Sequence, residues 1–279
     1  LANAASFPLT VATGDAPPIA KFAAAPFGVL ERLGEPVLPL TLRHVHGDLR
    51  TASPGGQVRV LRVTEPLSML QAYARVQALH ERQLKARDAG LPPASWTEIV
   101  SETDARGRTV QRRVDRWIGT REVSMLKALP EARRLELPAL QGGDPRPFEV
   151  VGIPLPEPGL HVVEIESSRL GAALLAPAAG GAVAPMYVRT AVLVTDLAVH
   201  FKLGRESSLA WVTTLDRAQP VADARVQVFD CTGKALWSGS TDAQGRARIH
   251  QPLPASRGEC LADAGVFVAA SRRTADGAQ

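Results

Sequence analysis

Short strand-like runs divided by turn residues constrain the fold of this chain more than any other feature. From Arg189 onward, runs of apolar or alternating residues recur about every 8 to 15 residues, with Gly, Pro and Asp between them, which is the spacing of an antiparallel sandwich. The sequence predicts seven strands there, at 191–195, 198–203, 209–214, 225–230, 235–240, 246–251 and 265–271. Two turns carry a late glycine able to adopt positive φ, at 230–234 and 241–246.

A second set of strand signals lies before Arg189. We predict strands at 7–12, 19–24, 37–45, 57–63, 133–137, 148–152 and 160–166, a low-complexity loop or linker at 171–185, and a sheet that resumes at Met186. The pattern changes at about 64–130, where apolar residues recur at helical spacing from Leu67 to Leu84, with Thr64 as the expected N-cap. A hairpin of 96–102 with 108–117 and a short helical piece at 123–129 are expected to follow.

Length and composition fit two globular domains. The chain has 279 residues, 45% hydrophobic and 22% charged, and two domains of that size can each bury a core. We expect a β-sandwich over 1–188, carrying a helix-containing and hairpin-containing insertion at about 64–130, and a seven-strand β-sandwich over 189–279. The fold class is therefore mainly β, with tandem antiparallel β-sandwiches.

The basic balance does not indicate a nucleic-acid partner. The net charge of +4 and pI near 9.4 come mostly from arginine, with 27 Arg and 5 Lys among the 32 basic residues. The densest basic run, at 106–121, is interleaved with Asp115 and Glu122 and lacks the aromatic residues on which single strands stack. This pattern favours a solvated face.

The sequence has no run of about 18 apolar residues, the length that a membrane helix needs. The first residues, 1–6, contain neither an initiator Met nor a signal-peptide pattern. We therefore expect the chain to be a piece of a longer precursor.

Motifs for catalysis, cofactors and metals give no candidate. There is no G-x-S-x-G elbow, phosphate-binding glycine loop or H-E-x-x-H pair. His44 and His46 share a face of a predicted strand and could chelate a metal with a third ligand, but an exposed pair of ordinary histidines is the favoured interpretation. We predict no catalytic, cofactor-binding or metal site and no enzymatic activity. The remaining histidines stand apart from any neighbouring nucleophile or acid: His80, His161, His200 and His250.

The four tryptophans allow a carbohydrate-binding alternative, because indole rings stack on sugars. The set is Trp96, Trp117, Trp211 and Trp237. Core packing is the favoured use, above all for Trp211, which stands in an apolar strand. Clustered exposed tryptophans would instead indicate a lectin-like or adhesin-like module.

Cys231 and Cys260 are the two cysteines, and their spacing fits neither a C-x-x-C redox motif nor a four-ligand zinc site. If the chain is exported, a disulfide between them closes a loop of roughly 30 residues and contributes about 3 kcal/mol. Two unrelated buried thiols are the alternative.

Several phrases in the last third resemble a macroglobulin domain of the bacterial alpha-2-macroglobulin family. They are 192–202, 209–213, Gln-Pro-Val-Ala-Asp-Ala-Arg-Val at 219–226, and Thr-Asp-Ala-Gln-Gly-Arg-Ala at 241–247. Their order and spacing match the family. Residues 152–165, with Pro-Gly-Leu-His at 158–161, are similar to the family's end-of-domain strand. The resemblance covers 148 to about 270, and residues 1–147 match in general character.

The resemblance implies sandwiches of macroglobulin or fibronectin-III type, upstream of a bait region, in a large periplasmic host-defence protein. Such proteins trap proteases after bait cleavage through a thioester and are usually anchored to the inner membrane, here as an expected lipoprotein. The thioester motif Cys-x-Glu-Gln occurs at neither Cys231 nor Cys260. We therefore expect a non-catalytic structural segment whose partners are other domains of the same polypeptide and, through the full-length protein, proteases. The alternative is an adhesin-like or carbohydrate-binding extracytoplasmic module.

Overall fold

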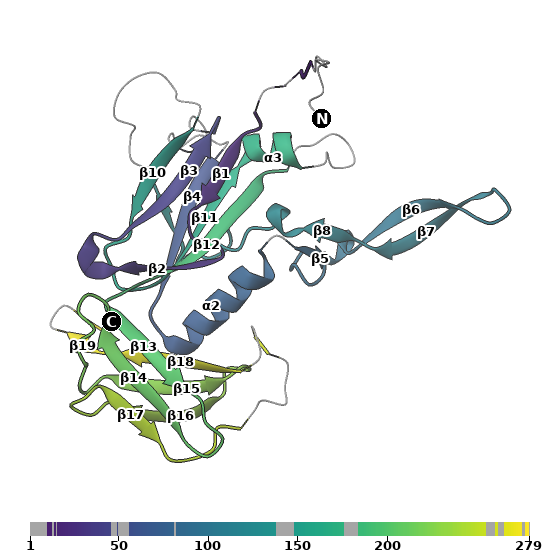
Figure 1. Cartoon of the computed structure of the whole chain (residues 1–279). Helices are drawn as coiled ribbons and strands as arrows, with labels where there is room; N and C mark the ends of the chain where they lie inside the picture. The colour runs from purple at the N-terminus through teal and green to yellow at the C-terminus, as the bar shows by residue number, and fades with distance from the viewer. Residues whose placement is uncertain are drawn as a thin grey trace, which may run out of the picture.

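The protein is mainly β in a computed structural model, and its strands form two sandwiches joined by a helix-containing insertion (Figure 1). The structure describes residues 10–12, 14, 16–45, 49, 56–80, 82–137, 148–175, 184–254, 260–261, 265–274 and 277–278. The predicted fold class is confirmed. No helix in these ranges has the length and apolar character needed to cross a membrane.

The first sandwich packs a three-stranded sheet against a five-stranded sheet. The three-stranded sheet is ordered β1 (Ile19–Phe22), β3 (Val37–Arg43), β10 (Glu149–Pro154). The five-stranded sheet is ordered β2 (Phe27–Glu31), β12 (Met186–Thr195), β11 (Gly159–Ser167), β4 (Gly56–Val63), β9 (Arg133–Leu135). β2 runs parallel to β12, and the other described pairings in these two sheets are antiparallel.

The five-stranded sheet is covered on both faces, which explains why β11 and β12 are apolar on both sides. Val163 and Ile165 point into the core shared with the three-stranded sheet, while Leu160 and Val162 pack under the insertion. A strand buried on both faces loses the apolar–polar alternation of a half-buried strand.

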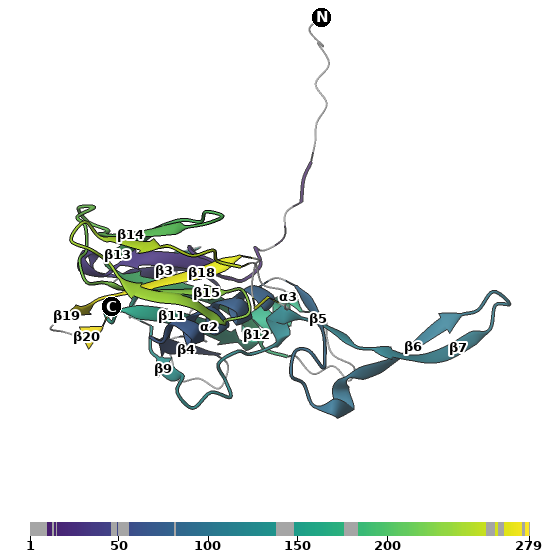
Figure 2. The same cartoon turned by 90° about the horizontal axis from the view of Figure 1, so that it is seen from below.

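The insertion lies between β4 and β9 and divides into a helix and a projecting hairpin (Figures 1 and 2). Its helix is α2 (Pro66–Ala78), and its strands are β5 (Gln83–Lys85), β6 (Thr97–Thr103), β7 (Thr109–Asp115) and β8 (Trp117–Gly119). Ala72 and Val76 of α2 pack on Leu160, Val162 and Ala191. The 3-10 turns are η1 (Arg32–Gly34), before β3, and η2 (Pro93–Ser95) and η3 (Thr120–Glu122), both in the insertion.

The second sandwich packs two three-stranded sheets. One is ordered β13 (Leu197–Lys202), β14 (Ser208–Thr214), β17 (Arg246–Ile249), and the other β16 (Ala235–Ser240), β15 (Arg225–Asp230), β18 (Val266–Ser271). Ala210, Val212 and Val226 are fully buried between them. A short pair, β19 (Arg273–Thr274) and β20 (Gly277–Ala278), follows.

The expected boundary at 188/189 falls inside β12. All ten residues of this strand belong to the five-stranded sheet of the first sandwich. The strand predicted at 191–195 is therefore the end of β12. Six of the seven strands predicted after Arg189 remain in the second sandwich, as β13 to β18. The division of the chain into two domains stays a prediction, with the change of sheet at Asp196.

Three local expectations are wrong. The helix ends at Ala78, and Leu84 lies in β5, which pairs with β8. Glu65 rather than Thr64 occupies the N-cap and makes no side-chain capping bond. Residues 123–129 form bends and a turn without an α-helix, and the N–H groups of Met125 and Leu126 bind the Glu164 carboxylate. The hairpin at 96–117 is confirmed.

Among the elements that the sequence did not predict are β2 and the helix α3 (Ser168–Leu174). α3 occupies the start of the predicted low-complexity loop and is capped by the Ser167 side chain, which accepts a hydrogen bond from Leu170 N. For the strand predicted at 7–12, residues 10–12 have no strand conformation and 7–9 lie outside the described ranges.

One turn design occurs three times. In each case an Asp carboxylate accepts the backbone N–H groups two and four residues later, and a glycine at the fourth position has positive φ. At Asp104 and Asp242 these N–H groups favour the ionised carboxylate and so lower its pKa. At Asp230 the hydrogen bond from the Thr232 hydroxyl is the main cause of the lowered pKa, and the N–H groups add to it. The Asp, Gly and basic residues are Asp104, Gly107 and Arg108; Asp230, Gly233 and Lys234; and Asp242, Gly245 and Arg246.

Candidate functional site: the junction between the sandwiches

Helix α2 joins the two sandwiches. Its buried face packs on the five-stranded sheet, while Leu67 in its first turn reaches the second sandwich. The Leu67 Cδ1 atom lies 2.6 Å from the point where a Cβ on Gly233 would stand, and the Leu261 Cδ1 atom lies 3.3 Å from the same point. The missing side chain of Gly233 therefore makes room for two leucines, one from each side of the junction.

The turn that carries Gly233 is held by polar contacts and by a cross-link. Asp230 Oδ1 accepts the N–H groups of Thr232 and Lys234, each at 2.9 Å. Leu261 N donates to Cys231 O at 2.7 Å, and the structure places Cys231 and Cys260 as a disulfide pair. Such a cross-link would hold Leu261 beside the turn on which Leu67 packs. The pairing stays a proposal.

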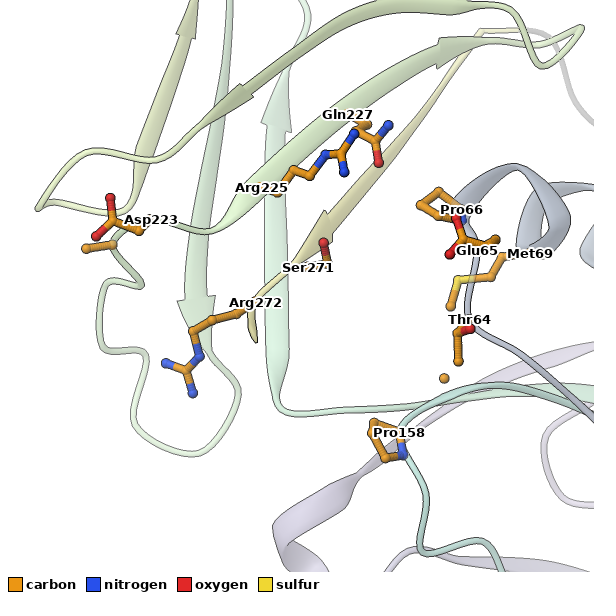
Figure 3. A pocket seen from close by; sticks show the side chains of 12 residues that line it. Thr64, Glu65, Pro66, Met69, Pro158, Asp223, Arg225, Gln227, Ser271 and Arg272 are labelled. Carbon is orange, nitrogen blue, oxygen red and sulfur yellow. The ribbon is translucent and has the colours of Figure 1, made fainter. Parts of the chain in front are cut away.

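A cavity of about 660 Å³ opens between the start of α2 and the second sandwich (Figure 3). Glu65, Pro66 and Met69 line it from α2 and the residues before it, and Arg225 and Gln227 of β15 face them. Among the lining residues there is neither a histidine nor a cysteine. Glu65 on one wall, and Arg225, Arg272 and Asp223 on the other, give a lining of mixed charge, which fits a contact surface between the sandwiches better than a reaction site.

A buried ion pair fastens the insertion to the five-stranded sheet. The side chains of Arg189 and Glu164 are 3% and 0% exposed, and Arg189 Nε donates to Glu164 Oε2 at 3.1 Å. Arg189 also donates to the carbonyl oxygens of Leu79, Thr120 and Val123. Burial lowers the pKa of Arg189, and the Glu164 carboxylate opposes that effect.

Glu164 completes the same network from the other side. Its carboxylate accepts the N–H groups of Met125 and Leu126, at 2.7 and 3.1 Å, and the Ser124 hydroxyl at 2.5 Å. The pair is therefore saturated with backbone groups and positions the insertion. This pair was not predicted from the sequence, although Arg189 is the one charged residue of β12 and Glu164 is one of two acidic residues in the apolar strand β11.

His161, one of the isolated histidines, is 1% exposed. Its Nε2 donates to Glu157 O at 2.7 Å, and its Nδ1 has no hydrogen-bond partner among the described residues. Burial lowers the pKa of His161. His161 is thus a core histidine bonded through one ring nitrogen.

The remaining candidates do not converge. His44 is exposed at the end of β3 with φ 56°, while His46 lies outside the described ranges. Within the described ranges, no group of three or more His, Cys, Asp or Glu could hold a metal.

The core assignment of Trp211 is wrong. Trp211 is 40% exposed on the outer face of β14, beside His200, and its Nε1 donates to Gln244 O. Trp96 and Trp117 are also exposed, and Trp237 packs against the second core.

The sequence matches one known family over its second sandwich. Residues 194–278 match the profile of the bacterial alpha-2-macroglobulin MG3 domain. No curated protein matches the chain.

Two solved structures of native alpha-2-macroglobulin from Escherichia coli are similar at a low level. The one spanning domains MG0-NIE-MG1 has 14% identity and a TM-score of 0.41, with 93% of this chain and 66% of that chain covered. The one spanning NIE-MG1 has 13% identity and a TM-score of 0.43, with 92% and 98% covered. TM-scores this low carry no argument, so the assignment rests on the sequence profile. Residues 194–278 thus match a domain model of the bacterial alpha-2-macroglobulin family, which bears out the resemblance of the last third.

Proposed function

We propose that this chain is a non-catalytic structural segment of a bacterial alpha-2-macroglobulin-like inhibitor that traps proteases. The profile match of residues 194–278 carries the proposal, because it coincides with the second sandwich. The segment would lie upstream of the bait region and contact other domains of the same polypeptide. Proteases would be its partners through the full-length protein.

The polar groups of the described residues support a structural role. Arg189 and Glu164 bind backbone groups of the insertion, and Asp230 binds its own turn. These groups hold elements together, whereas a reaction site needs a nucleophile and a base directed at a shared space.

Export to the periplasm, with an inner-membrane anchor on the parent protein, belongs to the same proposal. The disulfide between Cys231 and Cys260 supports it, since disulfides persist in oxidising compartments. A thiol assay on denatured protein purified from the periplasm should detect no free thiol before reduction and two after it. Two free thiols before reduction would argue against the pairing.

Sequencing the complete reading frame tests the family role. A Cys-x-Glu-Gln motif several hundred residues downstream would support the trap, and a catalytic or cell-wall-anchoring domain there would overturn it. Incubating this segment alone with proteases cannot test the role, because trapping requires the bait region.

The exposure of three tryptophans is the one observation that favours a second candidate, a carbohydrate-binding or adhesin-like module, whereas their placement on separate elements does not form the cluster that such a module needs. Trp96, Trp117 and Trp211 are 40%, 54% and 40% exposed. Trp211 lies in the second sandwich and the other two flank the hairpin, so the three stand on separate elements. Quenching of tryptophan fluorescence by a glycan, lost in Trp211→Ala, would support this candidate.

A further inference from the structure

The hairpin formed by β6, β7 and their turn, residues 97–115, extends away from both sandwiches (Figures 1 and 2). We name it the arm. Its two strands pair only with each other in the described structure. Contacts with the rest of the insertion lie at its base, where Lys85 Nζ meets Asp115 Oδ2 at 2.6 Å and Trp96 Nε1 donates to Leu91 O at 2.7 Å.

Both ends of the arm are fixed. At the tip, Asp104 accepts the N–H groups of Arg106 and Arg108 and pairs with the Arg108 side chain at 2.9 Å. At the base, Arg116 N donates to Trp96 O at 2.9 Å. An isolated two-stranded ribbon is only marginally stable in water. These contacts therefore stabilise the arm, which belongs to none of the hydrophobic clusters of the described residues.

The register identifies which backbone groups face outward. Asp104 N donates to Arg108 O and Arg116 N donates to Trp96 O, so even-numbered residues of β6 form the hydrogen-bonded pairs of the ribbon. Opposed residues alternate between hydrogen-bonded and non-hydrogen-bonded pairs. The backbone N–H and C=O groups of the odd-numbered residues therefore point away from the partner strand, toward the two open edges.

The two edges differ in composition. On β6 the outward-facing positions are Thr97, Ile99, Ser101 and Thr103; on β7 they are Thr109, Gln111, Arg113 and Asp115. Proteins usually protect an open edge with charge, proline or a bulge. The β6 edge has no charge or proline at these positions, and Ile99 is 62% exposed. These outward-facing positions therefore lack the features that usually block the addition of another strand.

The even-numbered side chains of β6 select the strand. Glu98, Val100 and Glu102 point to one face of the ribbon, two carboxylates on either side of a valine. Arg112 of β7 lies on the same face, with its Nη2 atom 3.7 Å from Glu102 Oε1, in a pair whose side chains are 66% and 55% exposed. Cross-strand neighbours of opposite charge stabilise a sheet, and like charges destabilise it. We propose that the β6 edge binds an extended segment that carries a basic residue, any residue, an apolar residue, any residue and a second basic residue, as an added strand of the arm.

The same charges argue against a second copy of this chain as the occupant. Antiparallel pairing of the whole of β6 with itself, centred on Val100, would place Glu98 opposite Glu102 of the other copy twice. A basic segment instead meets both carboxylates.

The test uses the purified 279-residue chain and a capped peptide with the core Arg-Thr-Val-Thr-Arg, with Glu-Thr-Val-Thr-Glu as the acidic control. Amide hydrogen exchange by NMR should slow at least tenfold at Thr97, Ile99, Ser101 and Thr103 with saturating basic peptide. The acidic peptide should have no effect, and E98R/E102R should exchange the two preferences.

Ser101→Pro removes an outward N–H of β6 and should weaken binding at least tenfold. Gln111→Pro is the matched control, because its N–H faces outward on the other edge; it should bind the peptide as the parent does. Slowed exchange on β7 instead of β6, equal binding of both peptides, or self-association of the chain that Ser101→Pro abolishes would each overturn the proposal.

Discussion

At the residue scale, the buried pair of Arg189 and Glu164 holds the insertion in position. Removing one member of a buried pair leaves an uncompensated charge and costs about 3–5 kcal/mol. Arg189→Met should therefore lower the free energy of unfolding by about that amount in urea denaturation. Arg205→Met is the control, since the Arg205–Glu206 pair is 92% and 82% exposed, and it should leave the value unchanged. An equal effect of the two variants would contradict the assignment.

His161 gives a pH dependence with a definite sign. Its folded-state pKa lies below the ordinary value of about 6.5, so below that pH the unfolded chain binds more protons and stability falls as pH falls. Between pH 7.5 and 5.5 the parent should lose up to about 1 kcal/mol more than His161→Gln, measured by urea unfolding at both pH values. His200→Gln, at an exposed histidine, should lose as much as the parent. A parallel loss in His161→Gln and the parent would show that His161 takes up as many protons in the folded state as in the unfolded state, which contradicts the lowered pKa.

At the scale of elements, two of the three Asp–Gly turns allow the free-energy cost of backbone strain to be measured apart from the cost of a close contact. Gly107 and Gly245 have φ of 77° and 72°, but a Cβ on Gly107 meets nothing within 4 Å whereas one on Gly245 would stand 2.4 Å from Val212 O. Gly107→Ala should cost about 1 kcal/mol, from the left-handed backbone alone. Gly245→Ala should cost at least about 1 kcal/mol more, because the backbone must move. Thermal unfolding of both variants measures the difference, and equal costs would contradict the close contact.

Elements with local signals were predictable from the sequence, and elements set by distant pairing were not. The alternation of β4 and the turn chemistry of the arm identify those strands directly. Leu84 fits the helical pattern of α2, but Gln83–Lys85 pairs with Trp117–Gly119, more than 30 residues away. β2 is a short run whose only partner in the described sheets, β12, is over 150 residues distant. α3 carries a local signal, the Ser167 cap, that the alanine-rich composition obscured.

At the scale of the whole molecule, the junction depends on Leu67, which packs with Leu261 in the space that Gly233 leaves open. Leu67→Ala should cost about 1 kcal/mol, less than a fully buried leucine, because Leu67 is 38% exposed. In a Cys231→Ala, Cys260→Ala background Leu261 is no longer held at the turn, so the same substitution should cost at least about 0.5 kcal/mol less. A double-mutant cycle in urea measures this coupling. Additive effects would show that the disulfide does not support the junction.

The junction could not be predicted from the sequence, for a related reason. The sequence indicated the turn at 230–234 and the cysteine pair separately, and nothing local connects either to Leu67, over 160 residues earlier. The family resemblance lies mainly in the second sandwich, whose turns and strands carry most of the matched phrases, and in the first sandwich it is limited to residues from 148 onward. The first sandwich lacked such phrases over most of its length.

The most direct measurement of the proposed function uses the full-length protein. An enclosed protease should still cleave a small chromogenic peptide but should lose activity on a large protein substrate. We therefore predict that preincubation with full-length protein leaves peptide hydrolysis by a test protease intact, strongly reduces its casein hydrolysis, and makes the protease co-elute with the inhibitor. Equal activity on both substrates, with no co-elution for any of a panel of proteases, would contradict a role in a protease trap.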